Sequence, residues 1–235
     1  MVLDPTVSQT ITGISSMATR NVLADLVEHY ARHSRQRVAV ESVGGVEAAR
    51  RILDGEPFDI VVLAADAIDR LTAAGRVVAG TRADLARSGV AIAVAAGAAQ
   101  PDIANEAAVR DAILAARSIG YSTGPSGAHL VRLFERWGIA ETIAPRVVQA
   151  PPGVPVGSLV ARGEIELGFQ QLSELMHLPG IDVVGPLPPD IQIVTVFSAA
   201  VCTTCEQVAE AHALISFLVS PQAASAKLAQ GMEPA

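Results

Sequence analysis

The feature that most constrains the fold of this 235-residue chain is the alternation of short β-branched runs with helical patterns. The runs 9–14, 37–41 and 59–63 are each followed by a segment in which apolar residues recur with the 3.6-residue period of a helix. This order is typical of strand–helix–strand units on a parallel sheet. Because 50% of the residues are hydrophobic but only 3% aromatic, the core must be built mainly from Ala, Val, Leu and Ile. The sequence therefore predicts an α/β protein with buried strands.

Two apolar segments, 89–95 and 191–201, stand out as candidates for strands that cross between two lobes. Two crossings would build one lobe from both ends of the chain and the other from its middle. We therefore expect lobe 1 to contain residues 1–88 with 198–235, and lobe 2 to contain residues 89–197. A cleft between two such lobes is the usual place for a small ligand.

Three predicted strands end in small or hydroxyl residues that lead into a helix, in GISSMATRN, ESVGGVEAAR and IGYSTGPSGAH. Helix starts leave backbone N–H groups unpaired and carry a partial positive charge, and Gly and Ser allow close approach. Several such starts aimed at one cleft would bind an anion without clustered Lys or Arg. Alternatively, Ser16 and Ser126 only cap their helices. The candidate ligand donors are Ser15, Ser16, Gly44, Gly45, Ser122, Thr123, Ser126 and Gly127.

Three further side chains are candidate ligand contacts. Arg20 lies about one turn inside the first helix, where it could hold a carboxylate in a bidentate pair or be a solvated surface charge. Gln170 and Gln171 follow a predicted strand, where amides can both donate and accept hydrogen bonds. They could equally be ordinary loop residues.

Charge and hydropathy exclude several classes of partner. The net charge of -7 and the lack of Lys/Arg runs argue against nucleic acid, whose phosphates need clustered positive charge. No apolar run approaches the roughly 20 residues that span a bilayer, so we expect no membrane insertion. The first 20 residues do not resemble a secretory signal. We therefore expect a cytoplasmic location as written, or a periplasmic one if a signal peptide has been removed.

Motifs of catalysis are sparse. No G-x-S-x-G elbow or P-loop is present, which argues against a hydrolase or a kinase. The five histidines show no metal-ligand spacing, and the sequence predicts neither a metal nor a cofactor. The CTTC segment could be a redox pair formed by Cys202 and Cys205, or two spectator thiols in a reducing compartment.

The order of these segments resembles the type II periplasmic solute-binding proteins, and within them the molybdate-binding branch, over nearly the whole chain. The resemblance rests on ISSMATRNVLADLVEHY, on GGVEAARRILDGEPFDIVVLAADAIDRLTAAGRV, on GYSTGPSGAHLVRLFERWGI and on ARGEIELGFQQLSEL. It implies a two-lobed fold of two mixed sheets flanked by helices and joined by two crossing strands. In that family the lobes close like a hinge over an oxyanion held by Ser hydroxyls and backbone amides. An exported member could also serve a transporter permease.

The departures from that pattern concern the ligand. The second-loop serine of the family is replaced by Gly44 and Gly45, and a late tyrosine is replaced by Gln170. An organic carboxylate is therefore at least as plausible a ligand as molybdate. We expect a solute-binding protein for a small anion.

A related branch of the same fold, aconitate isomerase, isomerises unsaturated tricarboxylates, and this is the alternative function. Its chemistry needs a base near the carbon acid and donors that stabilise an enolate-like charge. The candidate bases are Glu41, His129 and Glu174. None of the three has a spacing that singles it out.

Overall fold

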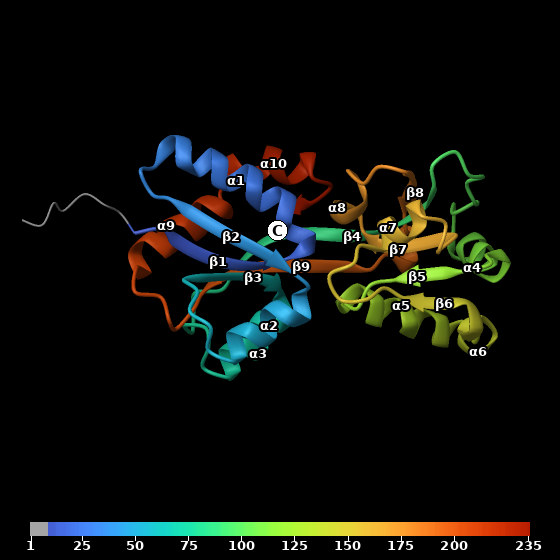
Figure 1. The fold of residues 1–235 in the computed structure, drawn as a ribbon, viewed down its shortest axis with the longest axis horizontal. Helices are drawn as coiled ribbons and strands as arrows, with labels where there is room; N and C mark the ends of the chain where they lie inside the picture. The colour runs from blue at the N-terminus through green and yellow to red at the C-terminus, as the bar shows by residue number, and fades with distance from the viewer. Residues whose placement is uncertain (1–8) are drawn as a thin grey trace, which may run out of the picture. The chain divides into compact units, whose positions relative to one another are not determined.

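The structure is a computed structural model that describes residues 9–235 (Figure 1). Residues 1–8, on which part of the expected absence of a signal peptide rests, lie outside the described residues. The chain divides into two compact units, Met1–Ala86 with Val196–Ala235 and Arg87–Thr195. They are called unit 1 and unit 2.

The sheet of unit 1 places three strand ends at one edge. Strand β1 (Ile11–Ser16) lies between β2 (Val38–Val43) and β3 (Ile60–Ala64) and is parallel to both. Strand β9 (Val194–Val201) pairs with β3 in the antiparallel direction. Because parallel strands end at the same edge, the loops that follow β1, β2 and β3 are neighbours.

Helices cover both faces of this sheet (Figure 1). On one face, α1 (Arg20–His33), α9 (Val208–Leu218) and α10 (Ala224–Ala229) pack their apolar residues against β1, β3 and β9. On the other, α2 (Gly45–Leu53) and α3 (Ala65–Ala73) form a second cluster. Both sheet faces are thus buried, which explains why β3 is apolar throughout. The short elements are η1 (Met17–Thr19), η4 (Pro221–Ala223) and β10 (Glu233–Pro234).

Unit 2 contains a second mixed sheet. Strand β4 (Ala83–Ala95) pairs in the antiparallel direction with β7 (Leu167–Gln171) and with β8 (Ile181–Pro186). Strand β5 (Ile119–Tyr121) is parallel to β7 and to β6 (Val147–Gln149). The carboxyl ends of β5, β6 and β7 therefore meet at one edge of this sheet.

The helices of unit 2 complete its core. Buried residues of α4 (Glu106–Ala115) and α5 (Pro125–Arg136) pack together with β4, β5 and β7. Smaller clusters lie under α7 (Val156–Ala161) and α8 (Leu172–Leu175). The remaining elements are α6 (Ala140–Ile143), η2 (Ala144–Arg146) and η3 (Pro189–Ile191).

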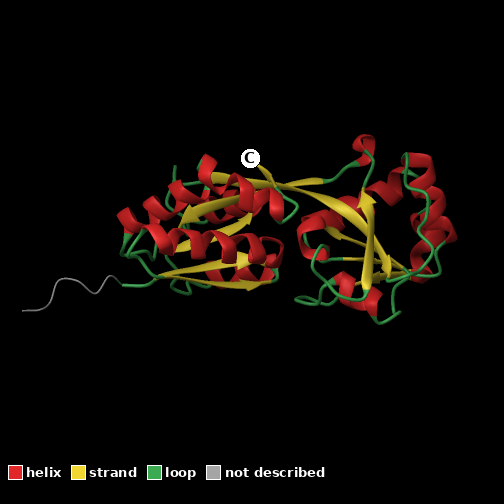
Figure 2. Cartoon of the chain, turned by 90° about the horizontal axis from the view of Figure 1, so that it is seen from above, coloured by secondary structure: helices red, strands yellow, loops and turns green. Residues whose placement is uncertain are grey.

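The predicted α/β class with two mixed sheets flanked by helices is confirmed. Strands β4 and β9 each have residues in both units, so the chain passes twice from one unit to the other, as Figure 2 shows. Strand β8 is an element that the sequence did not reveal. It is only partly buried, and it pairs with β4 across a register shift between Ile92 and Ala93. Its pairing with β4, rather than its own pattern of hydrophobic residues, makes it a strand.

Within residues 9–235, no helix has the length and apolarity that a membrane crossing needs. The same part of the chain contains no group of three His, Cys, Asp or Glu residues that could hold a metal ion.

Candidate functional site

Ser16 and Gly45 come together at the carboxyl edge of the unit 1 sheet. Ser16 ends β1, and Gly45 begins α2 directly after β2. A Cβ atom added to Gly45 would lie 3.6 Å from the Cβ of Ser16. Two of the three small-residue strand ends singled out in the sequence are therefore in contact.

The hydroxyl of Ser16 is buried without a hydrogen-bond partner. The residue is 7% exposed, and its Oγ bonds to no described atom. It is therefore not the cap of the turn that follows, which answers the capping alternative for this residue. An orphaned buried hydroxyl in a native fold calls for an explanation, because its desolvation costs about 1–3 kcal/mol. A ligand that accepts its proton is such an explanation.

The first turn of α2 adds backbone donors beside that hydroxyl. The first intrahelical bond runs from the Ala48 amide to the Gly44 carbonyl at 2.9 Å. The amides of Gly45, Val46 and Glu47 therefore precede the hydrogen-bonded ladder and carry the partial positive charge of the helix start. We call the Ser16 hydroxyl and these three amides the Ser16–Gly45 donor set.

The other unit 1 candidates have different surroundings. The Ser15 hydroxyl shares a 2.8 Å hydrogen bond with that of Ser42 on β2, so it joins the two strands. Arg20 is exposed at the first position of α1 and forms no ion pair with another described residue. Thr19 donates to the carbonyl of Ser16 at 3.0 Å and fixes the turn that presents the Ser16 hydroxyl.

Replacing Gly45 with alanine is expected to weaken ligand binding at least tenfold while leaving the fold intact. The new methyl would meet Ser16 Cβ at 3.6 Å, an ordinary contact, so the chain accommodates it. The same methyl would stand where a ligand must approach the first amides of α2. Calorimetric titration should show at least a tenfold loss of affinity with an unchanged melting temperature. Unchanged affinity would remove this turn from the site.

The third small-residue loop lies in unit 2, between β5 and α5. Gly124 caps α5 and Pro125 begins it, so Ser126 lies inside the helix and is not its cap. Ser126 is 5% exposed. The hydroxyls of Ser122, Thr123 and Ser126 bond to no other residue of the described chain. We call residues 122–127 the Ser122–Gly127 loop.

Gly127 holds this loop in its shape. A Cβ at that position would lie 1.9 Å from the carbonyl oxygen of Ser122 and 2.8 Å from the Tyr121 ring. The helix thus packs directly on the backbone of the loop that precedes it. Only glycine allows this approach, which keeps the hydroxyls of the loop near the start of α5.

The two glutamines at the end of β7 are engaged with the protein. Gln170 accepts from the Val156 amide at 2.8 Å and donates to Glu174 Oε1 at 2.8 Å. Gln171 donates through Nε2 to Thr195 at 2.8 Å, while its buried Oε1 has no partner in the described chain. Exchanging the oxygen and nitrogen positions of the Gln171 amide would still leave one of its two polar atoms without a partner. Gln171 therefore keeps one free group for a ligand.

The three candidate bases differ sharply in their surroundings. Glu41 is paired with Arg51 at 2.7 Å, and the guanidinium lowers the pKa of that carboxyl, so Glu41 is not retained as a base. His129 is exposed on α5. Glu174 is only partly exposed, and burial raises its pKa to about 7 against a weaker opposing effect of Gln170. Of the three, Glu174 has the pKa that suits proton transfer near neutral pH.

Cys202 and Cys205 are free thiols at the turn after β9. Burial raises the pKa of Cys202 to about 12. Burial and a hydrogen bond with Asp59 raise that of Cys205 to about 11. Both thiols are therefore protonated at neutral pH, which argues against the redox alternative because the thiolate is the reactive form.

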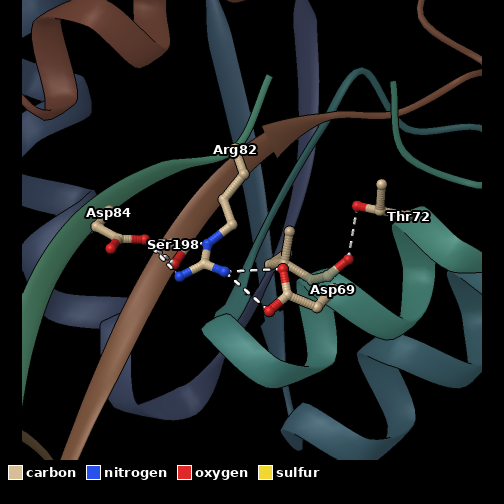
Figure 3. A network of polar contacts seen from close by, with 6 residues as sticks. Asp69, Thr72, Arg82, Asp84 and Ser198 are labelled. Atoms are coloured by element: carbon tan, nitrogen blue, oxygen red, sulfur yellow. Dashed lines mark hydrogen bonds and ion pairs between the residues drawn. The ribbon is translucent and has the colours of Figure 1, made fainter. Parts of the chain in front are cut away.

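Arg82 is neutralised within a network that joins three elements of unit 1 (Figure 3). Its guanidinium binds Asp69 of α3 at 2.8 Å and Asp84 of β4 at 3.0 Å. The Ser198 hydroxyl on β9 donates to the same Asp84 carboxylate at 2.7 Å. Arg82 is thus a structural cation, and the network ties the two strands that run on into unit 2.

Removing the Ser198 hydroxyl is expected to lower the free energy of unfolding by about 1 kcal/mol at pH 7, after allowance for solvent screening. This hydroxyl is the main cause that lowers the pKa of Asp84, with Arg82 adding to it. A lowered folded-state pKa gives stability that is present above the unfolded value, about 4, and is lost as the pH falls through the folded value. Urea unfolding should therefore separate Ser198→Ala from wild type at pH 7 and not at pH 2.

Ser42 and Thr195 are partners that sequence reasoning missed. Ser42 binds Ser15 from the adjacent strand β2, and Thr195 binds Gln171 from β9, which β4 separates from β7. Only the three-dimensional arrangement of the strands reveals such pairs, since the residues are 27 and 24 positions apart. A polar residue at the end of a predicted strand is the one signal that the sequence offered.

Comparison with known proteins finds similarity over most of the chain. The sequence profile described as bacterial extracellular solute-binding protein matches residues 11–233. An aconitate isomerase from Pseudomonas sp. is 36% identical over 231 residues, which cover 96% of this chain and 88% of that protein.

Solved structures share the fold at low sequence identity. The periplasmic molybdate-binding protein of Azotobacter vinelandii matches with a TM-score of 0.79 at 20% identity, covering 94% of this chain and 98% of that one. A sulfate-binding protein of Mycobacterium tuberculosis matches with a TM-score of 0.77 at 16% identity, covering 96% of this chain and 87% of that one.

Proposed function

The chain belongs to the bacterial extracellular solute-binding proteins, and on that premise we propose that it binds a small carboxylate anion, for which the Ser16–Gly45 donor set of unit 1 and, taken by itself, the Ser122–Gly127 loop of unit 2 each offer hydrogen-bond donors. The observation that carries the proposal is the buried, unpartnered hydroxyl of Ser16 beside the start of α2. A carboxylate oxygen would satisfy that hydroxyl and the neighbouring amides at once.

Neutral donors suit an anion in a chain of this charge. The net charge is -7, and the guanidinium groups of Arg82 and Arg51 both form ion pairs with carboxylates of the protein. Hydroxyls and helix-start amides attract a negative group without a counter-cation. Arg20, exposed on α1, is the cation of unit 1 closest in sequence to Ser16 and adds long-range attraction.

Calorimetric titration with a panel of anions tests the binding function. We expect cis- and trans-aconitate and related tricarboxylates to bind more tightly than molybdate and sulfate. Gly45, in place of a hydroxyl side chain, leaves room for carbon at the donor set. Absence of heat and of thermal stabilisation with every anion would contradict the proposal.

Isomerisation of an unsaturated tricarboxylate is the second candidate function. It is favoured by the 36% identity with an aconitate isomerase over 96% of this chain. Incubation with trans-aconitate, followed by chromatographic separation of the two isomers, tests it directly. Tight binding without interconversion of the isomers would contradict the isomerase function and support the binding function.

Location bears on which of these functions operates in the cell. The family description is extracellular, which supports the periplasmic location among the two that the sequence left open. An exported chain could hand its anion to a transporter permease, the partner expected from the resemblance. Fractionation of cells that make the full-length protein tests this proposal.

A further inference from the structure

Glu174 lies at the edge of unit 2 where the Ser122–Gly127 loop begins. Tyr121 of β5 and Phe169 of β7 are paired in parallel register, so Ser122 and Gln170 are the next residues on neighbouring strands. Such strands lie about 4.8 Å apart. Glu174 follows one turn later on α8 and is bonded to Gln170.

The carboxyl of Glu174 is held in place at one oxygen. Gln170 Nε2 donates to its Oε1, while Gln170 Oε1 is fixed by the Val156 amide, both at 2.8 Å. No other hydrogen bond to the carboxyl is formed within residues 9–235. The second oxygen is therefore available to a ligand.

Among residues 9–235, no charged group balances this carboxyl. Burial is the dominant influence on its pKa, and the only other one is the hydrogen bond from Gln170. Ionisable side chains do occur on the neighbouring segments. Asp182 on β8 accepts the Gly97 amide, Arg162 after α7 pairs with Glu164, and His177 follows α8. None of them affects the proton of Glu174.

From this geometry we propose that Glu174 is the proton-transfer group for an unsaturated carboxylate bound at the Ser122–Gly127 loop, and that Gln170 positions it. This inference rests on the second candidate function given above. The Glu174 carboxylate takes a proton from the saturated carbon next to the double bond. The π electrons move by one carbon, and the resulting carboxylic acid returns a proton to the far end of the three-carbon system. The composition of the ligand is unchanged, and no oxidant or reductant is needed.

The surroundings of Glu174 suit both the removal of the proton from the ligand and its return. The negative charge that develops on the ligand spreads into its carboxylates, where the hydroxyls of Ser122 and Ser126 can donate to it. A carboxyl that titrates near neutral pH is a base in one step and an acid in the next. The hydrogen bond from Gln170 keeps one oxygen fixed while the other exchanges the proton.

The full-length protein with cis- and trans-aconitate as probes provides the test. Glu174→Gln keeps an acceptor for Gln170 and removes the exchangeable carboxyl. We expect its turnover to fall about 100-fold or more while its dissociation constant for either isomer changes less than about threefold. Glu141→Gln, which alters an exposed glutamate on α6, is the matched control and should retain wild-type turnover.

The pH profile separates proton transfer from a structural role. Wild-type turnover should rise as the pH passes about 7, and deuterium from heavy water should enter the ligand. Because the Gln170 hydrogen bond lowers the pKa of Glu174, Gln170→Leu should move the midpoint of the profile to higher pH. An unmoved midpoint would contradict the positioning role of Gln170.

The possible results distinguish this inference from the binding function. Wild-type turnover that survives Glu174→Gln overturns the inference, as does tight binding with no interconversion in the wild type. Both results leave anion binding intact. Failure of the wild type to bind any carboxylate overturns the proposed function as well.

Discussion

Replacing Gly127 with alanine is expected to abolish ligand binding and to lower the free energy of unfolding by about 3 kcal/mol or more. The added Cβ would overlap the Ser122 carbonyl oxygen at 1.9 Å, and that oxygen belongs to the backbone, so no side-chain rotation relieves the clash. The helix start must move away from the loop. Urea unfolding measures the loss of stability, and calorimetry measures the loss of binding.

The matched control is Gly124→Ala in the same loop. A Cβ at Gly124 would meet nothing closer than Ser122 Oγ at 3.8 Å, and its φ of -76° suits any residue. This variant should keep its stability. If Gly127→Ala behaves like Gly124→Ala, then the close packing of α5 on Ser122 is not what shapes the loop.

Replacing Ser16 with alanine is expected to weaken anion binding by about 10- to 100-fold, because a hydrogen bond to a charged group contributes about 1.5–3 kcal/mol. The same change should not destabilise the free protein. The Ser16 hydroxyl has no partner among residues 9–235, so its removal takes away a desolvation cost and no hydrogen bond. Affinity and stability should thus respond in opposite ways.

Ser34→Ala serves as the control for this prediction. Its hydroxyl is also buried without a partner among the described residues, but it lies at the far end of α1, after His33. We expect Ser34→Ala to leave affinity unchanged. Equal loss of affinity in both variants would mean that the effect comes from the packing around α1 and not from a ligand contact.

Much of the fold could be predicted because its signals are local. Strand ends rich in Gly and Ser predicted the turns at Ser16, Gly45 and Ser126, because tight turns and close backbone contacts favour small residues. The membership of the solute-binding family agrees with the resemblance drawn from the sequence. Hydrophobic period alone placed β1, β3 and α1 within a few residues of their observed bounds.

The site could be predicted less fully because its details depend on contacts between distant residues. Glu41 was a plausible base until strand β2 placed it beside Arg51. Gln170 was a plausible ligand contact until both ends of its amide were found bonded within unit 2. The raised pKa of Glu174 arises from the burial of its carboxyl, and burial cannot be read from the sequence alone.

The most direct measurement is calorimetric titration of trans-aconitate into the wild-type protein and into a variant that carries Ser16→Ala and Ser126→Ala together. If anion binding depends on these hydroxyls, the wild type should give a saturable heat and the double variant should give none at the same concentrations. Wild-type affinity in a folded double variant would contradict anion capture by these donors.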